Sequence, residues 1–165
     1  MAQTTKPTSK PQSELMHLHV EAQRCTGCRV CEVFCSFRHE RAVQPSRARL
    51  WIQSIGQPGF FGVTVCQQCL DPECVNACAV GALCRDESSG LVRLDTESCV
   101  GCEACVSACP FGAMGFDTEK NVAFKCDWCG GNPECAAMCP THAVEFLPRG
   151  NGCAVSCTAS GLEEV

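Results

Sequence analysis

The chain has 165 residues, of which 19 are cysteine, and a formal net charge of −5. An acidic chain disfavours nucleic-acid binding, which needs a basic face, and no apolar run approaches the ~20 residues that span a bilayer as a helix. A cysteine content above a tenth of the chain instead indicates a disulfide framework or a set of metal sites.

The N-terminal tail, residues 1–19, contains one predicted strand. Residues 1–13 are polar and rich in Pro, Ser, Thr and Lys, a composition typical of a segment that is ordered only when something holds it. We expect this segment to contact a partner subunit or a further copy of the complex. Leu15–Val20 alternates in polarity, which predicts an edge strand, and we expect His17 and His19 to be strand residues and not metal ligands.

The first cysteine motif follows this strand and reads C-x2-C-x2-C-x3-C. Bacterial ferredoxins use this spacing to hold [4Fe–4S] clusters. Three thiolates point inward from one tight loop, and the fourth lies one helical turn further on. In two-cluster ferredoxins that fourth thiolate binds the other cluster, so one motif requires a second. The motif consists of Cys25, Cys28, Cys31 and Cys35.

Two predicted hairpins surround the second motif. Ala48–Ile55 and Phe60–Val65 read as strands on either side of the turn signal Gly56–Gly59. A shorter pair, Ala79–Leu83 and Leu91–Leu94, flanks a second turn. Between the two hairpins lies a motif with the spacing C-x2-C-x4-C-x3-C, formed by Cys66, Cys69, Cys74 and Cys78.

The third and fourth motifs complete the series. Gly101 in motif three matches Gly27 in motif one, and we expect either a positive φ or a close approach of backbone amides to cluster sulfurs there. Gly112–Phe124 predicts another short strand pair, and Ala143–Leu147 a final strand. Motif three consists of Cys99, Cys102, Cys105 and Cys109, and motif four of Cys126, Cys129, Cys135 and Cys139; each is followed by Pro.

Four complete motifs favour four [4Fe–4S] clusters over disulfides or zinc. The cysteine count is odd and no secretory h-region precedes motif one, both of which disfavour a disulfide framework. Zinc sites use cysteine pairs and do not need the third cysteine of each loop. Only 6% of the residues are aromatic and there is no Tyr, so we expect the clusters to replace much of the core and the apoprotein to be largely unfolded.

The distances between motifs predict how they pair. Motifs two and three are separated as in an ordinary two-cluster ferredoxin, and motifs one and four flank them. We therefore expect an α+β fold of two nested ferredoxin-like units, with short strands and short helices wrapped around the clusters. The inner unit covers about residues 62–117, and the outer unit 20–61 and 118–147. Residues 148–165 form a Gly/Ser-rich tail.

The stretches CTGCRVCEVFCSFRHE, CQQCLDPECVNACAVGAL and CVGCEACVSACPFGAM carry a family resemblance. From Val20 to Leu147 the chain resembles the four-cluster ferredoxin-type subunits of dimethyl sulfoxide reductase and formate dehydrogenase complexes. It is most similar to the small iron–sulfur subunit of tungsten-dependent aldehyde oxidoreductases. The resemblance implies a molybdenum or tungsten pterin catalytic subunit as partner, together with a flavin subunit that reduces NAD.

The resemblance also implies which cysteines share a cluster. Ser36 and Ala79 depart from the pattern of the family, where many relatives have Pro after motif two, but neither departure removes a ligand. The implied sets are Cys25, Cys28 and Cys31 with Cys139; Cys126, Cys129 and Cys135 with Cys35; Cys66, Cys69 and Cys74 with Cys109; and Cys99, Cys102 and Cys105 with Cys78.

Electron transfer is the predicted function, and bond-making catalysis is not expected. Each cluster would have four protein thiolates and no open iron, and no Walker loop, dinucleotide fingerprint or nucleophile elbow is present. Alternatives are a free, diffusing polyferredoxin or the iron–sulfur subunit of a formate dehydrogenase, hydrogenase or CO dehydrogenase complex. No leader or twin-arginine signal is recognised, so we expect a cytoplasmic protein.

Three cysteines and one group of charges remain. We expect Cys84 to be a buried, apolar strand residue, while Cys153 and Cys157 offer only half of a metal site. Basic residues gather around motif one and form either a solvated face or a docking patch for an acidic partner. Their charge predicts a higher reduction potential for the cluster of motif one than for the cluster of motif three, which lies beside Glu97 and Glu103. The basic residues are Arg24, Arg29, Arg38, His39, Arg41, Arg47 and Arg49.

Overall fold

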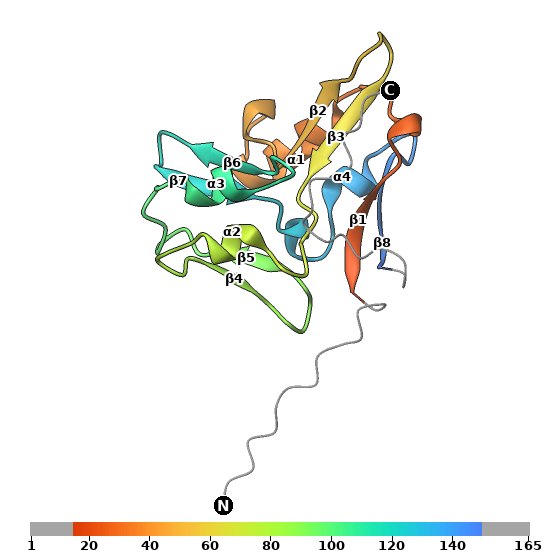
Figure 1. Ribbon diagram of the computed structural model, residues 1–165. Helices are drawn as coiled ribbons and strands as arrows, with labels where there is room; N and C mark the ends of the chain where they lie inside the picture. The colour runs from red at the N-terminus through yellow and green to blue at the C-terminus, as the bar shows by residue number, and fades with distance from the viewer. Residues whose placement is uncertain (1–14, 150–165) are drawn as a thin grey trace, which may run out of the picture.

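The structure, a computed structural model, describes residues 15–149 of the chain (Figure 1). Over these residues eight strands form four two-stranded antiparallel sheets, with four short helices between them. The strands are β1 (Met16–Val20), β2 (Leu50–Ser54), β3 (Phe61–Val65), β4 (Leu83–Arg85), β5 (Val92–Leu94), β6 (Met114–Asp117), β7 (Val122–Lys125) and β8 (Val144–Pro148). The helices are α1 (Val30–Glu40), α2 (Glu73–Asn76), α3 (Ala104–Ala108) and α4 (Glu134–Ala137).

The first and last strands of the described chain lie side by side. β1 pairs with β8 from Met16 opposite Pro148 to Val20 opposite Val144, and His17 Nδ1 lies 3.1 Å from the backbone oxygen of Leu147. The helices pair in the same order, since α1 packs against α4 and α2 against α3. Segments from the two ends of the chain therefore meet each other, and segments from the middle meet each other.

Each half has its own small hydrophobic core. One core contains buried Leu18, Leu50 and Val144 and packs against α1 and the β2–β3 hairpin. The other contains Leu83, Val92 and Met114. Thiols belong to both cores, and they supply a large share of the buried side chains because large apolar residues are few. The buried cysteines are Cys31, Cys35, Cys105, Cys126 and Cys135.

The predicted strands form, with one shifted. The β2–β3, β6–β7 and β1–β8 pairs lie within about two residues of their predicted bounds. The strand predicted over Ala79–Leu83 was wrong: β4 begins at Leu83, because Gly81 donates its N–H to the Cys78 carbonyl at 3.1 Å and turns the chain at φ +67°. The prediction that Cys84 is buried was also wrong, because strand alternation buries Leu83 and exposes Cys84.

Gly27 and Gly101 hold the loops of motifs one and three in the left-handed region, as expected, with φ of +68° and +71°. A Cβ atom on Gly101 would lie 2.6 Å from the backbone oxygen of Asn121. A side chain at this position would therefore meet both backbone strain and a clash with the β6–β7 turn.

We predict that Gly101→Ala destabilises the protein by more than the about 1–2 kcal/mol that an L-residue pays in this backbone region. The measurement is the midpoint of thermal unfolding of the iron-loaded protein. Gly112→Ala is the matched control, because Gly112 also has a positive φ, +58°, but nothing lies within 4 Å of its Cβ position. An equal loss in both variants would contradict the close approach at Asn121.

Candidate metal centres

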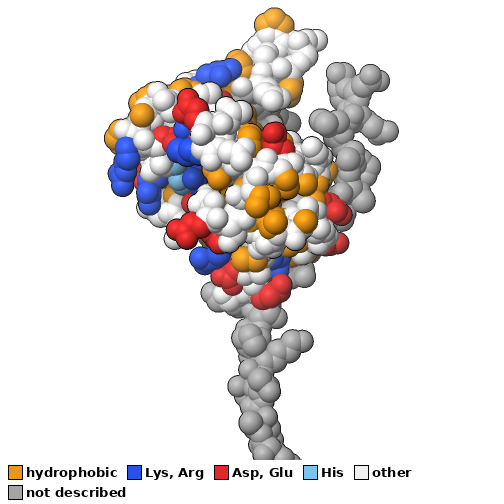
Figure 2. Space-filling view, turned by 90° about the vertical axis from the view of Figure 1, so that its left-hand side faces the viewer, with side chains coloured by type: hydrophobic (Ala, Val, Ile, Leu, Met, Phe, Trp, Pro, Cys, Tyr) orange, Lys and Arg blue, Asp and Glu red, His pale blue; other side chains and the backbone are white. Residues whose placement is uncertain are grey.

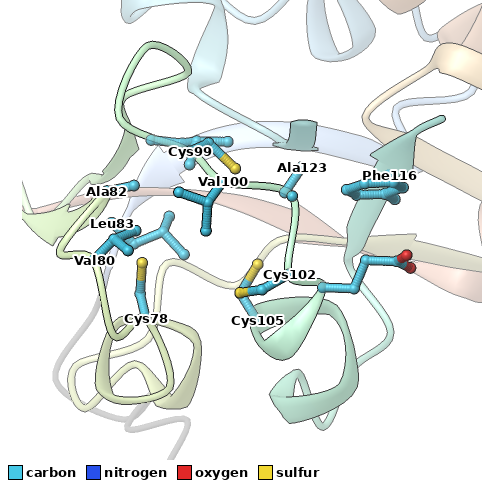
Figure 3. Close-up of a pocket in the computed structure, with 13 residues that line it drawn as sticks. Cys78, Val80, Ala82, Leu83, Cys99, Val100, Cys102, Cys105, Phe116 and Ala123 are labelled. Carbon is cyan, nitrogen blue, oxygen red and sulfur yellow. The ribbon is translucent and has the colours of Figure 1, made fainter. Parts of the chain in front are cut away.

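Four thiols from motifs two and three surround one small cavity. Figure 3 shows them around this space, with Val80 and Val100 beside them. The loop before α3 and the first turn of α3 supply three of the thiols, and the segment just after α2 supplies the fourth. We call this set the Cys99 group; it consists of Cys78, Cys99, Cys102 and Cys105.

A second small cavity is also lined by residues of motifs two and three. Its apolar walls include Phe111 and Met114. Three of its thiols come from motif two and the fourth from the end of motif three, so the two motifs exchange their last cysteines. We call this set the Cys66 group; it consists of Cys66, Cys69, Cys74 and Cys109.

Thiols of motifs one and four also lie close to one another. Burial, with smaller contributions from acidic neighbours that include Cys28 and Cys139, raises the pKa of Cys31 to about 12. Burial also raises the pKa of Cys135, and the thiols of Cys126, Cys35 and Cys129 add to the rise. For these two motifs we name the sets that the family resemblance implies: the Cys25 group (Cys25, Cys28, Cys31 and Cys139) and the Cys126 group (Cys35, Cys126, Cys129 and Cys135).

Electrostatic neighbours link the four groups in series, and we call this series the row. Burial raises the pKa of Cys74 to about 11, and Cys105 of the Cys99 group is among the neighbours that contribute. Burial likewise raises the pKa of Cys126 to about 12, with a contribution from Cys66. Cys31 contributes in turn to the raised pKa of Cys135. The order is therefore the Cys99, Cys66, Cys126 and Cys25 groups.

The two ends of this row are open and its middle is closed. Cys102 in the first group and Cys28 in the last are exposed. Cys69 and Cys129 hold the equivalent second position of their motifs in the two middle groups, and both are only partly exposed. Access from solvent is therefore greatest at the two ends.

The donor sets fit an iron–sulfur cofactor. Over residues 15–149, no cysteine forms a disulfide bond. Each group gathers four soft sulfur donors, the ligand type that iron–sulfur clusters take. Burial disfavours the thiolate form at several of these positions, and a bound metal reverses that preference because a coordinating thiol is deprotonated.

His39 is a neighbour of the metal centres that the cysteine spacing did not reveal. Its Nε2 lies 3.7 Å from Cys129 Sγ and 3.5 Å from Asp127 Oδ1, and burial lowers its pKa. His39 and Cys129 are 90 residues apart in the chain, so the fold and not the local sequence brings them together.

Much of the basic stretch around motif one is engaged within the chain. Arg47 forms ion pairs with Asp117 at 2.8 Å and Glu119 at 2.6 Å, and Arg49 pairs with Asp127 at 3.1 Å. These two arginines bind the β6–β7 hairpin and motif four, so they do not form a free docking patch. Arg24, Arg29, Arg38 and Arg41 are exposed.

The buried carboxylate of Glu32 also changes the expected charge beside motif one. Glu32 accepts the N–H of Ile52 at 2.7 Å and pairs with Arg29 at 3.3 Å. It lies next to Cys31 and contributes to the raised pKa of that thiol. Arg29 is therefore opposed by a buried acid, which weakens the expectation of a higher potential at this end.

Hydrophobic side chains are exposed near the Cys99 group. Val80 and Val100, which line its cavity, are 47% and 58% exposed. Figure 2 shows the face on the side of β6, β7 and α3, where hydrophobic side chains gather apart from a group of Lys and Arg side chains.

Residues 1–13, Cys153 and Cys157 lie outside the described residues. Over residues 15–149, no helix is both long and apolar enough to cross a membrane.

The 4Fe-4S dicluster domain family matches residues 59–149, which contain motifs two, three and four. The polyferredoxin-like subunit of an aliphatic sulfonate oxidoreductase from Pyrococcus furiosus is 39% identical over 131 residues, 79% of this chain and 75% of that protein. The electron transport protein HydN of Escherichia coli is 37% identical, over 78% of this chain and 86% of that protein. The thiosulfate reductase electron transfer subunit PhsB of Salmonella typhi is 36% identical, over 81% and 76%.

These relatives are named as electron-transfer proteins or subunits of oxidoreductases. Their matches extend over about four fifths of this chain, while the domain match alone covers its last three motifs. The cysteine motifs, the converging thiols and the similarity agree, and the chain belongs to the 4Fe-4S dicluster domain family.

Proposed function

We propose that this chain is an electron-transfer subunit that carries electrons through four [4Fe–4S] clusters. It links a catalytic molybdenum or tungsten pterin subunit to a flavin/NAD subunit or another carrier. The observation that supports this best is the row of four thiol groups with an exposed cysteine at each end. An electron-transfer chain needs its end clusters to be accessible to partner proteins. Burial of its middle clusters limits electron loss to oxidants in the solvent.

The sixteen thiols would hold the clusters in the crossed sets that the family resemblance implies. The Cys99 and Cys66 groups would belong to an inner ferredoxin-like unit, and the Cys126 and Cys25 groups to an outer one. The pairing of β1 with β8 and of α1 with α4 supports this nested arrangement. Four thiolates on each cluster leave no iron for a substrate, which agrees with a role without bond-making catalysis.

The partner is proposed from two kinds of similarity. The resemblance to small subunits of tungsten-dependent aldehyde oxidoreductases suggests a pterin subunit that oxidises an aldehyde. The relatives include subunits of an aliphatic sulfonate oxidoreductase and of a thiosulfate reductase, which supports membership of an oxidoreductase complex more than a free polyferredoxin. We place the protein in the cytoplasm, where thiols stay reduced.

We predict about sixteen iron atoms and as many acid-labile sulfides per chain, because four cubane clusters each hold four of both. Chemical analysis of anaerobically purified protein measures these contents. Values near eight would contradict the four-cluster proposal and leave one ferredoxin-like unit without clusters.

Double substitutions test the crossed sets. Cys69→Ala and Cys109→Ala should each lower the iron content by about four, and together by no more than about four, because both would serve one cluster. Cys69→Ala with Cys78→Ala should lower it by about eight. Cys84→Ala is the control and should change nothing, since Cys84 is exposed and outside the four groups. An additive loss in the Cys69 and Cys109 pair would contradict the exchange of last cysteines.

We predict that the affinity-tagged chain co-purifies from its native cells with a subunit that contains molybdenum or tungsten. Metal analysis and mass spectrometry of the complex identify that subunit. Recovery of the chain alone, with its iron content intact, would favour the free polyferredoxin instead.

A further inference from the structure

Lys125 is a buried lysine at the end of β7, directly before Cys126, and only 3% of it is exposed. Its Nζ donates to the backbone oxygens of Val92 at 2.6 Å and Cys126 at 2.8 Å. A third bond runs to Gln68 Oε1 at 3.2 Å. All three partners are acceptors, and an ammonium has three N–H groups and no acceptor site. The surroundings therefore match the charged form of this side chain.

Gln68 fixes the position of this ammonium. Its side chain is 1% exposed, donates to the Cys126 carbonyl at 2.8 Å and accepts the N–H of Val92 at 2.9 Å. The network connects motif two, strand β5 and motif four. Lys125 thus lies where the inner and outer parts of the chain meet.

The described residues provide Lys125 with no carboxylate partner. Lys120, five residues earlier in the same hairpin, is exposed and pairs with Glu40 at 2.9 Å and Asp117 at 3.6 Å. A buried charge without a counter-charge is strongly disfavoured.

The three acceptors connect this ammonium to two groups of thiols. Val92 lines the cavity of the Cys66 group, and Gln68 directly precedes Cys69 of that group. The third acceptor is the backbone oxygen of Cys126 itself. Lys125 therefore lies against the Cys66 and Cys126 groups, the two middle groups of the row.

We propose that the Lys125 ammonium is a fixed positive charge that raises the reduction potentials of the two middle metal centres above the value their burial alone would give. The inference rests on the proposed four-cluster function. Reduction adds one electron and no proton, and it takes a [4Fe–4S] centre with its four thiolates from about −2 to about −3. A nearby cation stabilises the more negative state. Lys125 is thus a positioning residue for charge, shared between the inner and outer units.

The experiment compares Lys125→Met with Lys120→Met in the full chain, by titration with dithionite as reductant followed by electron paramagnetic resonance. In Lys125→Met, the midpoints of two centres should shift downward while the other two stay unchanged. Lys120→Met should shift none, because that charge is exposed and already paired. The shift from Lys125 should persist in high salt, since ions screen a buried charge weakly. Unchanged midpoints, or an equal shift of all four, would overturn the proposal.

A second pair of variants separates charge from structure. Lys125→Arg keeps the cation, and Lys125→Gln keeps hydrogen-bonding capacity without the charge. At equal iron content, the Arg variant should retain higher midpoints than the Gln variant. Equal midpoints, or loss of iron from both variants, would show that Lys125 serves the fold and not the potentials. The iron content of the unsubstituted protein tests the proposed function independently of this result.

Discussion

The structure depends on one constraint: each group of thiols in motifs two and three contains three cysteines from one motif and one from the other. Cys78 closes the cavity of motif three, and Cys109 closes that of motif two. Two segments must therefore meet at each of these groups, which brings α2 against α3, while α1 packs against α4 in the other part of the chain. The two-stranded sheets are too small to be stable alone. They mainly connect one cysteine motif to the next.

Sequence patterns predicted the parts of the structure that depend on residues close together in the chain. Strand pairs such as β2–β3 were predictable because apolar alternation and a Gly-rich turn occur within about twenty residues. The left-handed backbone at Gly101 followed from the tight loop. The error at β4 arose because a turn at Gly81 delays the start of the strand by four residues. The error at Cys84 arose because alternation in this strand buries Leu83 and exposes its neighbour Cys84.

Contacts between distant segments could not be predicted in this way. The basic residues near motif one looked like one solvated group, yet Arg47 reaches Asp117 and Arg49 reaches Asp127. Nothing in the sequence marks Gln68 and Lys125 as neighbours, although the structure joins them within 3.2 Å and buries both. A count of charges along the sequence therefore misjudges the charge near the metal centres. Ion pairs neutralise several surface charges, whereas Lys125 is buried and forms no ion pair within the described residues.

The two ends of the row of thiol groups differ in surface chemistry. Beside Cys102 lie the exposed apolar side chains of Val80 and Val100, whereas Arg29, which follows Cys28 in the chain, is exposed and pairs with Glu32. An apolar surface gains free energy mainly by desolvation on contact, while exposed charges act through steering and orientation and weaken in salt. A chain that passes electrons between two different partners needs two surfaces that do not recognise the same protein. The unlike ends meet that requirement, and a freely diffusing carrier that used one site for all partners would not need it.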